Sequence, residues 1–422
     1  MDEMTNPLPF GWQEHAFRST IHGETHARPS APIDGAATVR RVAFLSRDRG
    51  KDLQVVAERI RMLAGEEAGG SARQLSFVRG SYMVTLELHN EFATLTWRAP
   101  AGDDVIWPEG IGLEALALLD FFAAMRVEVV LAPTVPAERI SQSAAASLCH
   151  SGLYDGQVEV ATNFIADSDG YVTFLLAASQ CGAQRRGVIV RRLLEIETYR
   201  SLALLGLPIA RQVGGRVQAQ EHDLERITAE IGDQSFIHVQ RRALDDLHRL
   251  SVEAGRLVEE TGFRFSATQA YGDILANRLE RLGERPLGES TTITRYLDNR
   301  IRPALATCRA MEKRLTDLGG RVQRSIELLN ATMSVAIQSQ NQEVLDTILS
   351  TAQSQYRLQE TVEGLSIIAI TYYGLGILSY LLEGMHDALP ISKPVLLSVA
   401  APVIAIMVFF VVRRLRRHKG AS

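Results

Sequence analysis

The stretch VEGLSIIAITYYGLGILSYLL occupies residues 362–382, and VLLSVAAPVIAIMVFFVV occupies residues 395–412. The first is apolar except for Glu363 and a few hydroxyl groups, and the second carries no charge. A hydrocarbon core about 30 Å thick needs roughly 20 helical residues. A buried hairpin in the core of a soluble protein is the alternative, but a core helix rarely needs so long an uncharged run. The sequence therefore predicts a transmembrane hairpin over residues 362–412, followed by a tail over residues 413–422.

The charges around the hairpin predict its orientation. The tail carries Arg413, Arg414, Arg416 and Arg417, whereas the link over residues 383–394 has one lysine against two acidic residues. Because basic flanks stay on the cytoplasmic side, the tail is expected in the cytoplasm, anchored on anionic lipid headgroups. Two spans return the chain to the same side, so both termini are predicted to be cytoplasmic.

The composition excludes several other classes. The chain has 422 residues and a net charge of −4, so no basic field favours nucleic acid as a partner. Its first residues contain neither a basic region nor an apolar region of a signal peptide. Cys149, Cys181 and Cys308 are scattered and form no CxxC pair, which suits a reducing compartment. No cofactor is predicted.

Residues 1–185 are predicted to form an α+β cytoplasmic domain with an N-terminal arm. Strands and helices are mixed without strict βαβ alternation, and the phosphate-binding patterns GxGxxG and GxxxxGK[ST] are absent. A mixed or largely antiparallel sheet is therefore expected. The expected strands are Val39–Leu45, Ser81–Leu88, Phe92–Trp97, Val127–Leu131, Val158–Ala166 and Tyr171–Leu176, and the expected helices are Lys51–Leu63, Leu113–Phe122 and one that begins at Pro136.

Residues 186–361 have the helical period and are predicted to form a bundle and a stalk. The first expected helix begins near Val188 and ends at Gly206 and Pro208. The following ones are Ile209–Ile231, Phe236–Glu260, Ser266–Leu282, Thr291–Leu318 with a kink at Pro303, and a last one from Val322 into the first span. Apolar residues at three- and four-residue spacing on the last helix favour a coiled coil with copies of the same chain, hence a homo-oligomer. The glutamines that interrupt this stripe at residues 338–342 either specify register or face solvent.

Two polar clusters are candidate sites in the first domain. Glu24, His26 and Arg28 lie in the arm, and His89 and Glu91 lie at the predicted hairpin. Together they would suit a metal or acid–base site, or a hydrogen-bonded network that pins the arm to the sheet. The identity of any metal is left open. No catalytic triad spacing, nucleophile elbow or HExxH occurs, so an enzyme is the less favoured class.

A basic cluster follows the sheet, at Arg185–Arg186 and Arg191–Arg192. It is either a solvated helix face or a site for an anionic ligand. Asp167 and Asp169 precede Gly170 and favour a hairpin turn over a calcium loop, because the remaining ligand positions are missing.

Several motifs resemble an uncharacterised family of predicted membrane-anchored bacterial proteins marked by N-E-x-H-A-R-P. Residues 23–29 read GETHARP, with Gly where the family has Asn. The stretches ELHNEF at 87–92, RLLEIETYR at 192–200, RFSAT at 264–268 and TVEGLS at 361–366 are similar to the same family. The resemblance covers nearly the whole chain and implies a bacterial inner-membrane protein, without implying an activity.

The architecture also resembles CorA-type cation channels, which combine a cytoplasmic body, a long stalk helix and two C-terminal spans. The resemblance implies that the first span lines a pore. Ser366, Tyr373 and Tyr380 recur every seven residues on that span and are the pore-lining candidates. The Gly-Met-Asn signature that closes the first span in that family is absent here.

Three functions remain in order of preference. The first is an oligomeric channel or transporter for an ion, with a divalent cation as one candidate, embedded in the lipid bilayer. The second is a membrane-tethered sensor or scaffold whose cytoplasmic domain binds a ligand or partner. The third is a membrane-bound enzyme that uses the histidine, glutamate and arginine cluster.

Overall fold

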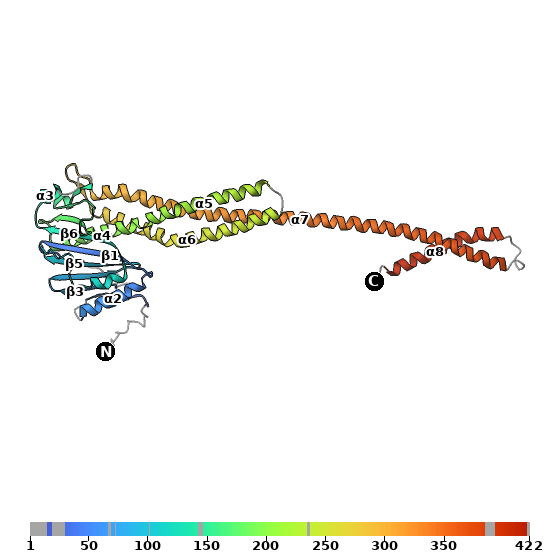
Figure 1. Cartoon of the computed structure of the whole chain (residues 1–422), viewed down its shortest axis with the longest axis horizontal. Coiled ribbons are helices and arrows are strands. Elements are labelled where there is room, and N and C mark those ends of the chain that lie inside the picture. The colour runs from blue at the N-terminus through green and yellow to red at the C-terminus, as the bar shows by residue number, and fades with distance from the viewer. Residues whose placement is uncertain are drawn as a thin grey trace, which may run out of the picture. The chain divides into compact units, whose positions relative to one another are not determined.

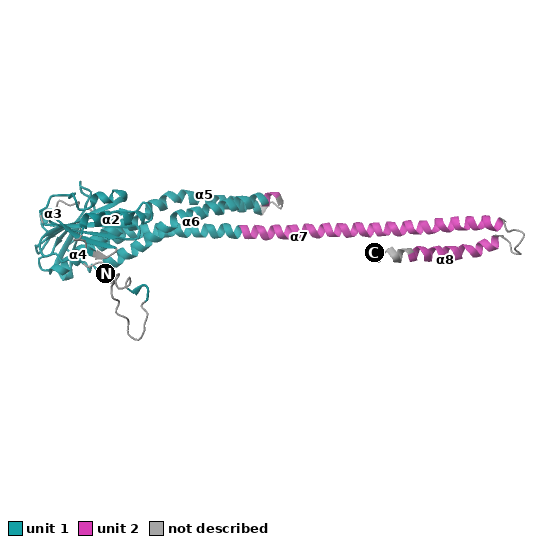
Figure 2. Ribbon diagram, turned by 90° about the horizontal axis from the view of Figure 1, so that it is seen from below, with its two compact units in different colours: residues 1–235, 241–325 teal, residues 236–240, 326–422 magenta. Residues whose placement is uncertain are grey.

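The computed structural model describes residues 15–18, 30–65, 69–71, 73–100, 102–141, 147–233, 237–384 and 393–419. The chain divides into two compact units, coloured separately in Figure 2. Unit 1 comprises Met1–Ser235 and Arg241–Ser325, and unit 2 comprises Phe236–Gln240 and Ile326–Ser422.

Unit 1 contains a ten-stranded sheet in the order β10-β7-β8-β9-β6-β1-β5-β4-β3-β2. All neighbouring strands are antiparallel except β6 and β9, which are parallel. The predicted α+β class with a mixed sheet is thereby confirmed. The strands are β1 (Ala37–Leu45), β2 (Gly69–Ser71), β3 (Gln74–Arg79), β4 (Tyr82–Leu88), β5 (Phe92–Pro100), β6 (Asp120–Val130), β7 (Cys149–Leu153), β8 (Val158–Thr162), β9 (Val172–Ala177) and β10 (Arg285–Pro286).

Helices cover both faces of the sheet (Figure 1). Helix α2 (Lys51–Ala64) and the short 3₁₀ helix η3 (Leu113–Leu118) pack on one face, and α4 (Ala183–Leu204) packs on the other. Successive strand residues point to opposite faces. Val42 of β1 accordingly belongs to the core under α2, whereas Val39 and Ala43 belong to the core under α4.

The predicted helix Leu113–Phe122 is wrong in its second half. The helical turns end at Leu118, and Asp120 begins the longest strand of the sheet, β6. This strand pairs with β1 along its length, with Phe121 opposite Phe44. The backbone hydrogen bonds of that long ladder outweigh the local helical spacing of the leucines. The short helix α3 (Ala137–Ser141) begins after Pro136 as predicted.

The remaining helices are longer than predicted. They are α5 (Gly206–Asp233), α6 (Ile237–Glu280), α7 (Ile293–Gly384) and α8 (Lys393–Lys419). Two expected segments merge into α6, and Thr291–Leu318 merges with the last predicted helix into α7, with Pro303 inside it. Glycines at the expected breaks cost only about 1 kcal/mol each in a helix interior, which packing offsets. In unit 1 the three helices α5, α6 and α7 share a core of Ala210, Val213, Val217, Leu257, Phe265, Cys308, Met311 and Leu315.

Unit 2 contains the C-terminal part of α7 and all of the described part of α8. Among the described residues none beyond Leu329 is buried. Both helices include a stretch long and apolar enough to cross a membrane. They lie side by side in Figure 2, and a Cβ added to Gly374 of α7 would lie 3.4 Å from Ile404 of α8.

Candidate functional site

The hairpin half of the predicted histidine and glutamate cluster is a structural joint. Glu91 is only 6% exposed. Its carboxylate accepts two hydrogen bonds from Arg264 of α6, at 3.1 and 2.7 Å, and one from the Tyr271 hydroxyl at 2.7 Å. The His89 ring stacks on Phe92 with 3.9 Å between the ring centroids. Glu24, His26 and Arg28 lie outside the described residues, so the arm is not placed against this joint.

The Tyr271 hydroxyl of this joint keeps its proton. Burial of Tyr271, followed by its hydrogen bond to Glu91, raises the pKa of the phenol, so Tyr271 stays a donor. The Glu91 carboxylate, paired with a guanidinium and a phenol in this way, attaches the start of β5 to α6. General-base chemistry would need that carboxylate to be accessible.

Metal binding finds no support among the described residues. No group of three or more histidine, cysteine, aspartate or glutamate side chains lies close enough there to hold an ion. The three cysteines are buried, and burial raises the pKa of Cys149 to about 12. Such thiols are packing groups rather than ligands or nucleophiles.

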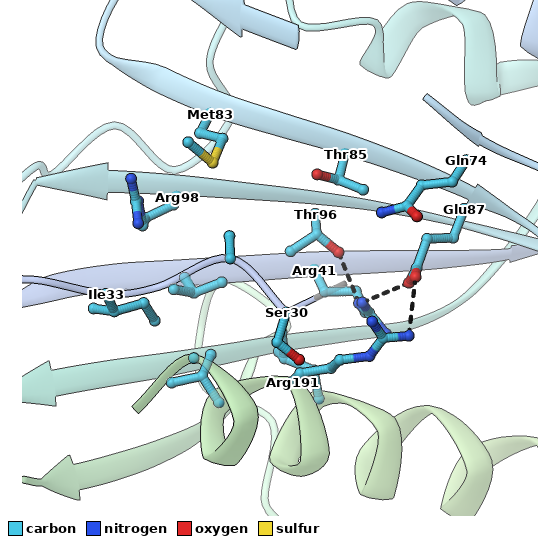
Figure 3. A pocket seen from close by; sticks show the side chains of 15 residues that line it. Ser30, Ile33, Arg41, Gln74, Met83, Thr85, Glu87, Thr96, Arg98 and Arg191 are labelled. Carbon is cyan, nitrogen blue, oxygen red and sulfur yellow. Dashed lines mark hydrogen bonds and ion pairs between the residues drawn. The ribbon is translucent and has the colours of Figure 1, made fainter. Parts of the chain in front are cut away.

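A cavity of about 100 Å³ lies between the sheet and α4 (Figure 3). Alternate residues of β1, β4 and β5 face it, as do residues of one side of α4. Its apolar wall consists of Ile33, Val39, Met83, Val190 and Leu194, and its polar wall of Ser30, Gln74, Thr85, Thr96, Arg98 and the charged groups described next.

A chain of ion pairs runs along the cavity. Glu87 pairs with Arg41 at 2.8 Å, and both side chains are almost fully buried. Arg41 also donates to the Thr96 hydroxyl at 2.8 Å. Arg191 of α4 lies 3.4 Å from Glu87 and 2.9 Å from Glu195, and Arg278 of α6 lies 2.6 Å from Glu195. The two carboxylates are thus neutralised by arginines from three different elements.

The basic cavity continues into a second hollow. This hollow, of about 220 Å³, is lined by Ser30, Val188, Arg191, Arg192, Glu195, Arg278 and Arg281. The first cavity shares Ser30 and Arg191 with it. Both hollows together hold six arginines (41, 98, 191, 192, 278, 281) and two glutamates (87, 195), a formal charge of +4. Arg98, Arg192 and Arg281 have no acidic partner within the described part of the chain.

One wall of the cavity is a strap, residues Ser30–Asp34, that crosses α4. Arg186 is buried and donates to the carbonyl oxygens of Ile33 at 2.7 Å and Asp34 at 3.0 Å. A Cβ on Gly187 would lie 2.1 Å from the carbonyl oxygen of Ala31, so only glycine lets the strap approach α4 this closely. The predicted basic cluster therefore divides: Arg186 holds the strap, while Arg191 and Arg192 line the hollows.

A different polar surface lies on the first apolar stretch of α7. Tyr372, Tyr373, Gly376, Ser379 and Tyr380 line an open groove there, with Leu375 and with Leu397 of α8. The side chains of Tyr373 and Tyr380 are 69% and 79% exposed. Within the described chain no hydrogen bond of their hydroxyls is present, whereas the Ser366 hydroxyl donates to the Val362 carbonyl at 2.8 Å.

The basic tail is described in part. The guanidinium of Arg413 lies 5.9 Å from the centroid of the Phe409 ring, and Arg414 is exposed. The side chains of Arg416 and Arg417 lie outside the described ones.

Sequence reasoning missed the buried Arg41–Glu87 pair and the strap. A usable signal was present in the sequence. Arg41 and Glu87 each lie within a predicted strand at a position that the strand buries, and a buried charge needs a partner. The partner of Glu91 on α6, far along the chain, had no local signal.

Comparison with known proteins identifies a family but no activity. The family described as "Protein of unknown function (DUF3422)" matches residues 13–419. No curated protein matches. The CorA magnesium transporter from Methanocaldococcus jannaschii is a solved structure with 11% sequence identity, and the match covers 80% of this chain and 99% of that chain with a TM-score of 0.18. At that score the similarity supports no statement about fold or function.

Proposed function

Because the chain belongs to the DUF3422 family, whose description assigns no activity, we propose its function from the geometry of its two units. We propose that several copies assemble into a cation channel of the bacterial inner membrane, with the first span of each copy facing the pathway. The proposal is carried by the exposed tyrosines of α7, Tyr372, Tyr373 and Tyr380, here called the tyrosine row.

The tyrosine row needs partners that α8 does not provide. The residues of α7 that are partly buried in unit 2 include Ile367, Thr371, Gly374 and Leu378, and they follow a stripe at three- and four-residue spacing. Tyr373 and Tyr380 lie off that stripe and stay exposed. A hydroxyl facing hydrocarbon without a partner costs free energy, so these groups favour a neighbouring helix or a watery pathway.

The stalk part of α7 also favours assembly. Val344, Leu345, Ile348 and Leu349 are 52–60% exposed although all four are apolar. An apolar stripe on a long helix is stable when it packs against another helix. Copies of this chain would cover the stalk stripe and the tyrosine row at the same time.

Cations are the favoured cargo because of the charges near the groove. Residues 362–382 contain no basic residue, and Glu383 follows Ser379 and Tyr380 at helical spacing on the same side of α7. Tyrosine rings add an electron-rich surface that attracts cations. The basic tail after the second span favours cytoplasmic termini, with unit 1 on the cytoplasmic side.

The test begins with the mass of the full chain in mild detergent. A closed oligomer of several copies should be found, and proteoliposomes should then pass K⁺ or Mg²⁺ down a gradient. Tyr373→Phe and Tyr380→Phe should lower the flux several-fold because they remove the hydroxyl. Ile368→Ala is the control, since Ile368 lies about 140° around the helix from Tyr373 and is also exposed. A monomer or dimer without flux would overturn the channel proposal.

A second function is favoured by the basic cavity of unit 1. In a membrane-tethered sensor, the cavity would bind a ligand and the spans would serve only as an anchor. Binding to unit 1 by a chain that conducts no ion would support this function over the channel.

A further inference from the structure

We propose that the two joined hollows beside α4 bind a small organic phosphate. The phosphate group would lie in the hollow of about 220 Å³, here called the outer hollow, and the organic part in the cavity of about 100 Å³, here called the inner cavity. The proposal concerns unit 1 alone and does not depend on ion conduction by the spans.

The charge of the outer hollow favours a phosphate. Four arginines and one glutamate line it. The Arg192 guanidinium reaches the backbone of Arg281 there, because it donates a hydrogen bond to the carbonyl oxygen of Arg281. A phosphate monoester carries a charge near −2 at neutral pH and offers three acceptor oxygens, so it neutralises this surplus better than a single carboxylate does.

Two arginines of the site, Arg191 and Arg278, are held in place before a ligand arrives. The carboxylates of Glu87 and Glu195 orient Arg191, and Glu195 orients Arg278. These side chains come from α4 and α6 and are fixed by contacts with β4 and with each other. Guanidinium groups held in this way lose little conformational entropy on binding an oxyanion.

The inner cavity suits the rest of the ligand. It has an apolar side made by Val39, Met83 and Leu194 and a polar side with Gln74 and Thr85. Its volume of about 100 Å³ excludes a large group. The strap closes one wall, so a ligand there would lose part of its contact with water.

The Arg41–Glu87 pair limits how deep the phosphate can lie. Glu87 is buried at the inner cavity and cancels the charge of Arg41, so this pair gives an anion no net attraction. Arg192 and Arg281 place two positive charges without acidic partners at the outer hollow. The inner cavity has one such charge, Arg98, whose guanidinium donates to the carbonyl oxygen of Pro32. The geometry therefore orients the ligand with the phosphate outward.

The test is calorimetric titration of the full chain in detergent with phenyl phosphate, inorganic phosphate and benzoate. Phenyl phosphate should bind more tightly than inorganic phosphate, because its ring also fills the inner cavity. It should bind more tightly than benzoate, because a phosphate group carries more negative charge than a carboxylate. Arg281→Ala should weaken phenyl phosphate about tenfold by removing one charge-assisted contact. Arg256→Ala, an exposed arginine elsewhere on α6, is the matched control and should leave binding unchanged.

A second variant separates the two hollows. Met83→Trp should fill the inner cavity, so that phenyl phosphate loses its advantage while inorganic phosphate still binds. The proposal is overturned if folded wild-type protein binds neither phosphate, if Arg256→Ala weakens binding as much as Arg281→Ala, or if benzoate binds as tightly as phenyl phosphate. The titration is independent of the flux assay, so failure of one does not decide the other.

Discussion

Glu91 shows how a single residue joins distant parts of unit 1. It lies in the turn between β4 and β5, yet its partners Arg264 and Tyr271 belong to α6. The side chains of Arg264 and Glu91 are 18% and 8% exposed, so their charges are largely shielded from water. Loss of either member of the Arg264–Glu91 pair would leave a buried charge without its counter-charge.

Arg264→Ala is therefore expected to lower the free energy of unfolding by about 3 kcal/mol, because the Glu91 carboxylate loses its counter-charge in a buried place. Urea unfolding followed by circular dichroism measures the change. The double variant Arg264→Ala with Glu91→Gln should recover part of the loss, since the buried group is then neutral. Arg256→Ala serves as control. If Arg256→Ala lowered the free energy of unfolding as much as Arg264→Ala does, the role of the Arg264–Glu91 pair would be contradicted.

At the scale of elements, the helices of unit 1 are joined by an apolar core and by a few ion pairs near the surface. Arg314 of α7 holds Glu221 of α5 through two hydrogen bonds, at 3.2 and 2.5 Å. The hydrogen bond from Arg314 lowers the pKa of Glu221 from its ordinary value of 4.5. The carboxylate is thus stabilised as an anion in the folded state.

This pair predicts part of the acid sensitivity of unit 1. A lowered carboxyl pKa contributes stability that is present above the unfolded pKa and is lost as the pH falls through the folded pKa. The loss on going from pH 7 to pH 3 should be smaller in Arg314→Ala than in wild type, by about 0.5 kcal/mol because both side chains are partly exposed. Urea unfolding at the two pH values measures it. Arg216→Ala, which breaks a more exposed pair with Glu260, is the comparison. An unchanged pH dependence in Arg314→Ala would refute the assignment.

At the scale of the whole molecule, burial ends well before the chain does. Leu329 is the last buried residue among those described, and the stalk and both apolar stretches follow it. Every buried residue of the sheet and of the α5–α6–α7 core is therefore in the chain up to that point.

A chain that ends after Gln340 is accordingly expected to fold and to remain in solution without detergent. Its thermal midpoint should lie within a few degrees of the transition of unit 1 in the full chain, since it keeps that core intact. Differential scanning calorimetry of both chains tests this. A control that ends after Gly283 lacks α7 and should unfold at a much lower temperature, because it loses Ile293, Leu297, Ile301 and the α7 part of the helical core. Aggregation of the longer chain would show that unit 1 needs the segment beyond Gln340.

The sequence by itself determined the class of the fold and the two apolar stretches, because these depend on local composition and on hydrophobic periods of two and 3.6 residues. It also determined the turn at Asp167, whose carboxylate accepts hydrogen bonds from the backbone N–H groups of Asp169 and Tyr171. Only the tertiary structure decided that Asp120 begins a strand, that Glu91 meets α6, and that arginines from β1, α4 and α6 surround joined hollows. Each of these depends on residues far apart in the chain, where long-range pairing and charge compensation outweigh local preference.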